Sequence, residues 1–326
     1  MVSIRLGLAC GLGFAASLAF VSAAAAQNWP TKPVRMVVPM PPGSGSDLVA
    51  RAMGQRLSAQ WGQPVVVDNR PGGNTIIGNE AIARASPDGH SLLFGIDLGF
   101  TVAPHLQKVP YDPIMDFAPI TMIASFASVM VAHASLPAGN IRELIALAKA
   151  QPGKFAYGTL GSGSGSHLLT EMLNHRADAR LLHVPYKGVP QLTAAILGGE
   201  VQLAWSGIFS MLPHIKSGKL RPMAYGGGKR SALIADVPTL VELGMPDVEY
   251  SVWYGLLAPA GTPRPIIARI HADVSTLITE PVFRDKELLA RAYEPSGLGP
   301  DEFAALIRRE LESRALMVKL SGAKAD

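Results

Sequence analysis

The chain has 326 residues, of which 48% are apolar and 17% are charged, and its formal net charge at pH 7 is +4. This charge is small, and the lysines and arginines are scattered along the chain, so no basic patch supports nucleic-acid binding. We therefore expect no nucleic-acid partner.

The first 26 residues have the pattern of a cleaved secretory signal peptide. Arg5 precedes an apolar run over residues 6–21, and residues 23–26 are alanines that fit a cleavage site. A transmembrane anchor is the weaker alternative, because the apolar run is short and ends in small residues. Cys10 is the single cysteine, so the exported chain would hold neither a thiol nor a disulfide. The remaining length suffices for two domains.

Short apolar runs alternate with helical patterns, which is typical of an α/β fold with largely parallel sheets. Apolar runs predict strands at residues 34–38, 65–67, 91–95, 120–132 (two strands), 155–159, 181–184, 201–205, 220–225 and 253–258. Helical periodicity with flanking Gly and Pro predicts helices that include residues 46–60, 76–85, 141–148, 168–173, 189–197, 266–278 and 303–311.

Two of the apolar runs, at residues 120–132 and 253–258, are placed to carry the chain between domains. We expect a first domain formed by residues 27–126 and 251–326, and a second formed by residues 127–250. Two crossings make a double hinge, so the expected architecture is a pair of α/β domains with a cleft that opens and closes.

Two glycine–serine loops, at residues 43–47 and 161–167, follow predicted strands and run directly into predicted helices. Gly43 and Gly163 hold equivalent places and are 120 positions apart. A single run of Gly and Ser is usually a linker or a turn. Two copies in the same setting instead predict two anion pockets, because glycines allow close approach and first-turn N–H groups point at a ligand. We expect both to face one shared site.

Motifs for catalysis and for cofactors are incomplete in this sequence. No serine stands in Gly-x-Ser-x-Gly, and neither glycine loop completes Gly-x-Gly-x-x-Gly. His167, His175 and His183 lack metal-ligand spacing and an accompanying carboxylate cluster. We therefore expect no enzyme, no cofactor and no metal. The alternative is an exported α/β hydrolase that uses a loop serine, such as Ser164, with His167.

The two loops favour a small carboxylate as the ligand. A helix N-terminus stabilises an exposed anion by about 0.3–1 kcal/mol, whereas micromolar binding requires about 8 kcal/mol. Several charge-assisted hydrogen bonds of about 1.5–3 kcal/mol each, made inside a closed cleft, supply the difference. A carboxylate can accept from both loops at once. His167 and Lys187 are further candidate contacts, and each also fits a role away from the ligand.

Short motifs follow one another in a characteristic order along the chain. They are Trp29-Pro30-Thr31-Lys32-Pro33-Val34-Arg35, Val38-Pro39 with the following loop and Asp47, Asn69-Arg70-Pro71-Gly72, Pro87-Asp88-Gly89, Pro110-Tyr111-Asp112-Pro113, Ser166-His167-Leu168, His183-Val184-Pro185-Tyr186-Lys187-Gly188 and Leu256-Leu257-Ala258-Pro259-Ala260-Gly261-Thr262-Pro263. In this order they resemble the periplasmic solute receptors of tripartite tricarboxylate transporters, known as Bug receptors. The resemblance covers essentially the whole exported chain.

The resemblance implies a two-domain periplasmic-binding-protein fold of the Venus-flytrap type, with two hinge-crossing segments. It implies capture of a small organic carboxylate in the periplasm and delivery to integral membrane permease subunits. The positions that it places around the ligand are Ser44, Gly45, Ser46, Asp47, Ser162, Ser164, Gly165 and Ser166. We expect the receptor to be a monomer.

Two positions depart from the pattern of these receptors. Ser206-Gly207 stands where such receptors often carry Asp-Asn, so Ser206 is a candidate ligand contact and a ligand without a cationic amine is favoured. Asp97 is an acid where Gly or Ser is more usual, and the sequence leaves open whether it faces the cleft. It also leaves open a receptor of the same fold that reports its ligand to a signalling partner instead of a permease.

Overall fold

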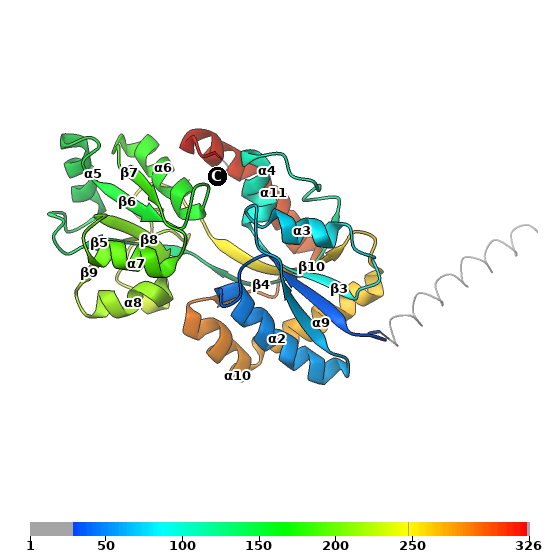
Figure 1. Ribbon diagram of the computed structural model, residues 1–326. Helices are drawn as coiled ribbons and strands as arrows, with labels where there is room; N and C mark the ends of the chain where they lie inside the picture. The colour runs from blue at the N-terminus through cyan, green and yellow to red at the C-terminus, as the bar shows by residue number, and fades with distance from the viewer. Residues whose placement is uncertain (1–28, 247, 325–326) are drawn as a thin grey trace, which may run out of the picture.

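The structure, a computed structural model, describes residues 29–246 and 248–324. The predicted signal peptide at residues 1–26 lies outside the described residues. The chain forms two α/β lobes that lie side by side and are joined by long strands (Figure 1). The two-sheet α/β architecture expected from the sequence is confirmed.

Six strands form the sheet of the first lobe. They are β1 (Val34–Val38), β2 (Val65–Asn69), β3 (Ser91–Ile96), β4 (Phe117–Phe126), β10 (Val252–Pro259) and β11 (Glu294–Pro295). Their order across the sheet is β11-β4-β10-β3-β1-β2. The helices of this lobe are α2 (Gly45–Trp61), α3 (Ile76–Ala83), α4 (Ala103–Leu106), α9 (Arg264–Thr279), α10 (Pro281–Phe283) and α11 (Pro300–Ser321).

Five strands form the sheet of the second lobe. They are β5 (Ser128–His133), β6 (Ala156–Thr159), β7 (Leu182–Pro185), β8 (Leu203–Gly207) and β9 (Leu220–Tyr225). Their order is β7-β6-β8-β5-β9. The helices are α5 (Ile141–Ala150), α6 (Gly165–Ala177), α7 (Val189–Leu197) and α8 (Ile208–Lys216). The sequence patterns did not predict α8 or the short α4 and α10.

The sheets are mixed, so the expectation of largely parallel sheets was wrong. β1 pairs in parallel with β2 and β3, and β6 pairs in parallel with β7 and β8. β10 is antiparallel to β3 and β4, and β5 is antiparallel to β8 and β9. The physical reason is the double crossing: the chain leaves the first lobe through β4 and returns through the neighbouring β10, so these strands run in opposite directions.

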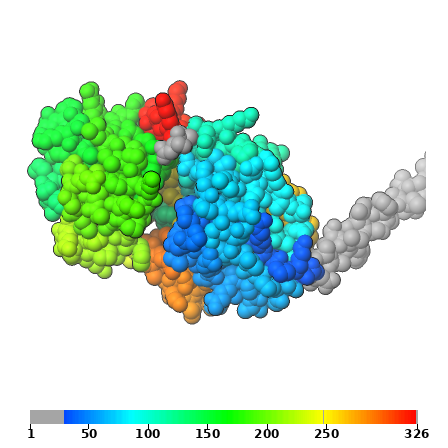
Figure 2. Space-filling view, in the orientation of Figure 1, coloured from blue at the N-terminus to red at the C-terminus, as the bar shows by residue number. Residues whose placement is uncertain are grey.

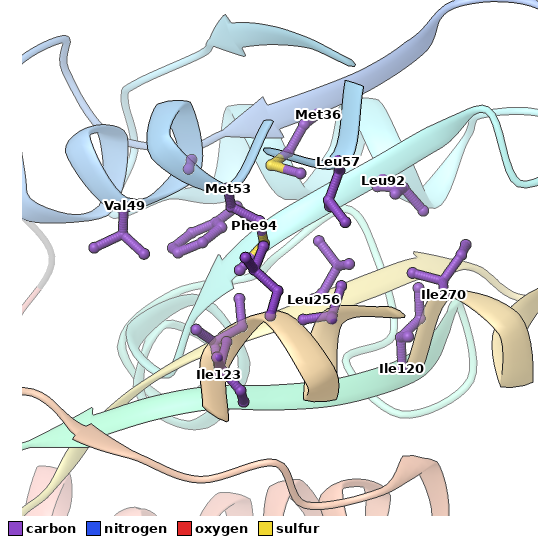
Figure 3. Close-up of a cluster of buried hydrophobic side chains, with 14 of the residues drawn as sticks. Met36, Val49, Met53, Leu57, Leu92, Phe94, Ile120, Ile123, Leu256 and Ile270 are labelled. Atoms are coloured by element: carbon purple, nitrogen blue, oxygen red, sulfur yellow. The ribbon is translucent and has the colours of Figure 1, made fainter. Parts of the chain in front are cut away.

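The core of the first lobe forms where α2 and α9 cover one face of its sheet. Val49, Met53 and Leu57 are spaced four residues apart on α2 and are fully buried. They pack with sheet residues such as Leu92 and Phe94 (Figure 3). Each side chain of this size stabilises the fold by about 1.5–3 kcal/mol on burial. This packing fixes the position of the first turn of α2, where one predicted anion pocket lies.

The C-terminal helix α11 contacts both lobes. Phe303 and Ile307 in its first half belong to a buried cluster of the first lobe. Met317 and Val318 in its second half belong to the cluster that holds the core of the second lobe. In Figure 1 this helix runs beside α4 and reaches toward α6, which it contacts. The lobes are therefore connected by a helix as well as by the two strand crossings.

The surface is furrowed between the two lobes, where the green and blue surfaces meet in Figure 2. The domain boundaries given above, at residues 126/127 and 250/251, stay predictions. Among the described residues, no helix has both the length and the apolar character that a membrane span requires.

Candidate ligand-binding site

The junction between β1 and α2 is held together by the side chains at its own helix start. Ser44 is the N-cap of α2, and its Oγ accepts from the Asp47 N–H at 3.3 Å. The same Oγ lies 3.1 Å from the Ser46 Oγ. The Asp47 carboxylate accepts from the Gly43 N–H at 2.8 Å and so fastens the loop onto the helix.

The junction between β6 and α6 repeats these contacts at the equivalent positions. Ser164 is the N-cap of α6, and its Oγ accepts from the His167 N–H at 3.4 Å and lies 3.2 Å from the Ser166 Oγ. His167 Nδ1 accepts from the Gly163 N–H at 3.0 Å. The imidazole therefore takes the place that the carboxylate of Asp47 has in the first lobe.

Both junctions present backbone N–H groups that the helices themselves do not use. Gly45 and Ser46 open α2, and Gly165 and Ser166 open α6, so their N–H groups precede every intrahelical acceptor. The two helices have 17 and 13 residues, long enough for aligned peptide dipoles to place partial positive charge at these ends. Each junction can therefore donate several hydrogen bonds to an anion.

The two junctions pack on the same returning segment of chain. A Cβ on Gly45 would clash with the Tyr293 hydroxyl and lie 3.2 Å from the Tyr254 hydroxyl. A Cβ on Gly165 would clash with the Tyr250 ring. Tyr250 and Tyr254 are four residues apart on the segment that enters β10, a span of about 13 Å in extended chain. Both helix starts thus lie along one short stretch between the lobes.

Asp97 lies on this same stretch, at the end of β3. Its N–H donates to the Trp253 carbonyl at 3.3 Å, and its Oδ2 accepts from the Tyr250 hydroxyl at 2.5 Å. Burial, helped by the nearby Glu310, raises the pKa of Asp97 to about 7, although the Tyr250 hydrogen bond and Arg314 oppose that rise. The structure therefore places Asp97 between the two junctions, a position that the sequence left open.

Other sequence-predicted residues lie in different environments. The Asp47 carboxylate also accepts from Arg51 and Asn69, so it is held by three groups of the protein itself. Burial alone would raise the pKa of Asp47, but its hydrogen bonds with Arg51, Gly43 and Asn69 lower it below the ordinary value. Ser162 is half-buried in the second loop, and Lys187 is exposed between β7 and α7.

Ser206 is buried near the end of β8. Its Oγ lies 3.1 Å from the Ser210 Oγ, at the start of α8. The contact of Ser206, and of the other predicted residues, with a ligand stays a prediction.

Three tyrosines around the helix starts were not predicted as site residues. Tyr250 contacts the start of α6, and Tyr254 and Tyr293 contact the start of α2 and share a hydrogen bond. They are distant in sequence from the glycine loops and follow no motif. Glycine at positions 45 and 165 is compatible with a bulky group lying opposite, but the sequence did not say which residues these are.

Ser164 Oγ and His167 Nδ1 are each used in hydrogen bonds to the backbone of the second loop. Ser164 Oγ donates to the Gly161 carbonyl at 2.7 Å, whereas His167 Nδ1 accepts from Gly163. A hydrolase requires the base to accept a proton from the nucleophile. Within the described residues there is also no group of three side chains suited to hold a metal ion.

Comparisons with known proteins show the family and the fold. The family described as tripartite tricarboxylate transporter family receptor (TctC) matches residues 49–322. The chain belongs to this family. Protein BugT of Bordetella pertussis is 33% identical over 316 residues, which cover 95% of this chain and 96% of BugT. The family and its homologues are solute-binding receptors, so the hydrolase alternative is set aside.

Solved structures with the same fold include receptors of this kind. The periplasmic binding protein BugD has a TM-score of 0.76 and 31% identity, with 91% of this chain and 99% of BugD covered. Rpa4515 of R. palustris, solved with adipate, has a TM-score of 0.80 and 30% identity, with 91% and 99% covered. The periplasmic-binding-protein fold predicted for this TctC-family receptor is confirmed.

Proposed function

We propose that this TctC-family receptor is exported to the periplasm, captures a small organic carboxylate between its lobes and delivers it to a permease of the tripartite tricarboxylate type. The observation that carries the proposal is the pair of equivalent junctions at α2 and α6. Each has the same serine N-cap and the same anchored glycine, and both pack on one stretch of chain between the lobes.

The ligand carboxylate would accept from the first-turn N–H groups of both helices. Gly45 and Ser46 donate from the first lobe, and Gly165 and Ser166 donate from the second. Because the donors belong to different lobes, one acid group can engage all of them only when the lobes are close together, which links capture to closure. The Tyr293 hydroxyl lies beside the start of α2 and can add a further donor.

A ligand with at least one carboxylate fits the donors of the two helix starts best. The donors are neutral N–H and O–H groups at positive helix ends, which favour an anion. Ser206, at the end of β8, contacts Ser210 and carries no charge that would pair with an amine. The adipate in the Rpa4515 structure is a dicarboxylate of this type. Adipate and its shorter homologues are therefore the first compounds to test.

Export and delivery are supported by the sequence and by the family. Residues 1–26 have the pattern of a signal peptide, and the family name refers to a tripartite transporter. A receptor that signals to a membrane sensor would use the same cleft. A ligand-dependent pull-down from membranes that contain the permease distinguishes the two, because delivery requires the permease to be the protein that is captured.

A melting experiment tests carboxylate capture directly. The mature protein is unfolded, freed of any retained ligand by dialysis, refolded, and heated with adipate, succinate or citrate, with propylamine as the control. A ligand at 100 times its Kd stabilises the native state by about 2.7 kcal/mol, which corresponds to a rise in Tm of roughly 4 °C for a chain of this length. We expect at least one acid to produce such a rise. No rise with any of them contradicts the proposal.

A further inference from the structure

A buried cluster of charged side chains lies between the lobes, beside the proposed ligand site. Asp97 is 1% exposed and accepts from the Tyr250 hydroxyl. Glu310 of α11 accepts from the Trp253 indole N–H at 2.9 Å. Arg314, one turn further along α11, lies 3.8 Å from Glu310 and stacks over the Tyr250 ring at 4.0 Å. The cluster therefore combines two acids with one arginine.

Two tyrosines lie between this cluster and the two helix starts. Tyr250 joins Asp97 to the start of α6, since its ring lies against Gly165 and its hydroxyl donates to Asp97. Tyr254 lies against Gly45 at the start of α2, and in the pairing of β10 with β3 it stands opposite Ile96, the residue before Asp97. An anion held by the two helix starts would therefore lie near Asp97, with Tyr250 on one side and Tyr254 on the other.

An added anion at this place conflicts with the charge of the cluster. With both acids ionised, Asp97 and Glu310 outnumber Arg314, and the region has little water to screen them. A ligand carboxylate adds a further negative charge. Negative charges close to one another raise the pKa of the acid that is hardest to ionise. Protonation of Asp97 or Glu310 would therefore relieve the repulsion with the ligand carboxylate.

We propose that Asp97 takes up a proton from solvent when the cleft binds its carboxylate, so that the receptor captures the anion together with a proton. This inference rests on the proposed function and goes beyond it, because a receptor without an acid at this position would bind the anion alone. On release of the ligand, the proton returns to solvent.

The groups around Asp97 favour the assignment of the proton to this residue. The ionisable groups that act on it are Tyr250 and Tyr254 from the returning segment and Glu310 and Arg314 from α11. In the turn that follows Asp97, the Leu98 backbone N–H forms a hydrogen bond that lowers its pKa. Burial raises the pKa of Asp97 to about 7, so the carboxyl is partly protonated near neutral pH and responds to a modest added field. Burial also raises the pKa of Glu310, but Arg314 and the hydrogen bond from Trp253 oppose that rise.

Calorimetric titration of the mature receptor with adipate and with succinate tests the proposal. Both acids are ionised across pH 6.5 to 8.5. Titration at pH 7 in two buffers of different ionisation enthalpy counts protons, and we expect uptake of close to half a proton. If only protonated Asp97 accepts the anion, a pKa of about 7 makes the affinity fall roughly 25-fold from pH 6.5 to pH 8.5.

Two variants identify the acid. Asp97→Asn keeps an acceptor for the Tyr250 hydroxyl but cannot titrate, so we expect no proton uptake, an affinity independent of pH, and tighter binding than wild type at pH 8.5. Glu310→Gln is the matched control within the same cluster and should retain proton uptake. Uptake that persists in Asp97→Asn and disappears in Glu310→Gln overturns the assignment to Asp97.

The wild-type measurement stands even if a variant fails to fold. Binding of either acid without proton uptake, at an affinity that is flat between pH 6.5 and pH 8.5, overturns this inference and leaves the proposed function intact. Absence of binding by both acids at pH 6.5 and at pH 8.5 contradicts carboxylate capture of this type and the inference together.

Discussion

Asp47 and His167 show how one requirement is met by two different residues. In each lobe a backbone N–H at the start of the loop needs an acceptor four residues later, at the first helical turn. A carboxylate oxygen and an unprotonated imidazole nitrogen both satisfy it. The resemblance placed Asp47 around the ligand, and His167 was a further candidate. Their observed contacts give them a role in shaping the donor loops, which is a different way of serving the same site.

Replacing Asp47 with Asn tests this role at the residue scale. Asp47 has a folded pKa below 3.8, so its stabilisation is present above pH 3.8 and is lost as pH falls through the folded pKa. We expect Asp47→Asn to lower the free energy of unfolding by about 1–2 kcal/mol at pH 6. The difference should shrink below pH 3.8. Urea titrations from pH 2.5 to pH 7 measure it.

The control for this experiment is an exposed aspartate with an arginine neighbour. Asp285 pairs with Arg284 on the surface, so Asp285→Asn should change stability by less than about 0.5 kcal/mol at any pH. If the curves of Asp47→Asn and wild type run parallel over the whole pH range, the charge of Asp47 does not support the loop.

At the scale of elements, the sequence predicted those whose signal is local. The strand–loop–helix units at β1–α2 and β6–α6 were expected, because apolar runs, capping serines and helical periodicity stand next to one another. The antiparallel direction of β5 and β10 was not expected, because the direction of a strand depends on where the chain re-enters the sheet. α8 was missed as well, although its apolar residues Ile208 and Met211 are buried; its interior Pro213 weakens the helical signal.

The contact between the start of α6 and the Tyr250 ring gives a prediction about ligand affinity. Gly165→Ala would push a methyl group into the Tyr250 ring, and either the ring or the first turn must move. Because hydrogen bonds to a charged group contribute about 1.5–3 kcal/mol each, loss of one donor should weaken carboxylate affinity about tenfold or more. Calorimetric titration with the acid that gives the largest Tm rise measures the effect.

A second helix-start glycine is the matched control. Gly299 precedes α11 away from the helix starts of α2 and α6, and a Cβ there meets only atoms at 3.7 Å or beyond. Gly299→Ala should leave the affinity unchanged. Equal affinities for wild type and Gly165→Ala would show that the α6 start does not grip the ligand.

At the scale of the molecule, the lobes are coupled by more than the two strand crossings that the sequence suggested. The hydrogen bond between Tyr250 and Asp97 joins the returning segment to the end of β3. The second half of α11 packs into the cluster of the second lobe, although its first half belongs to the first. Any closing motion must therefore preserve or rearrange the packing of α11, so this helix restricts the positions that the lobes can take.

In the last turns of α11, a buried residue and an exposed residue stand next to each other, and comparing them tests this coupling. Met317 is 4% exposed and packs in the second-lobe cluster, whereas the adjacent Leu316 is 56% exposed. Truncation of a buried Met to Ala destabilises a protein by about 2–5 kcal/mol, and truncation at an exposed position changes stability by no more than about 0.5 kcal/mol. We expect Met317→Ala, and not Leu316→Ala, to lower the urea midpoint.

Hydrogen exchange then shows which helices lose stability in Met317→Ala. If α11 couples the lobes, Met317→Ala should speed exchange in α6, which α11 contacts, and leave α3 of the first lobe protected. Leu316→Ala should resemble wild type in both helices. Unchanged exchange in α6 would mean that α11 only covers the second lobe without supporting it, and the motion of the lobes would then depend on the crossings at β4–β5 and β9–β10 alone.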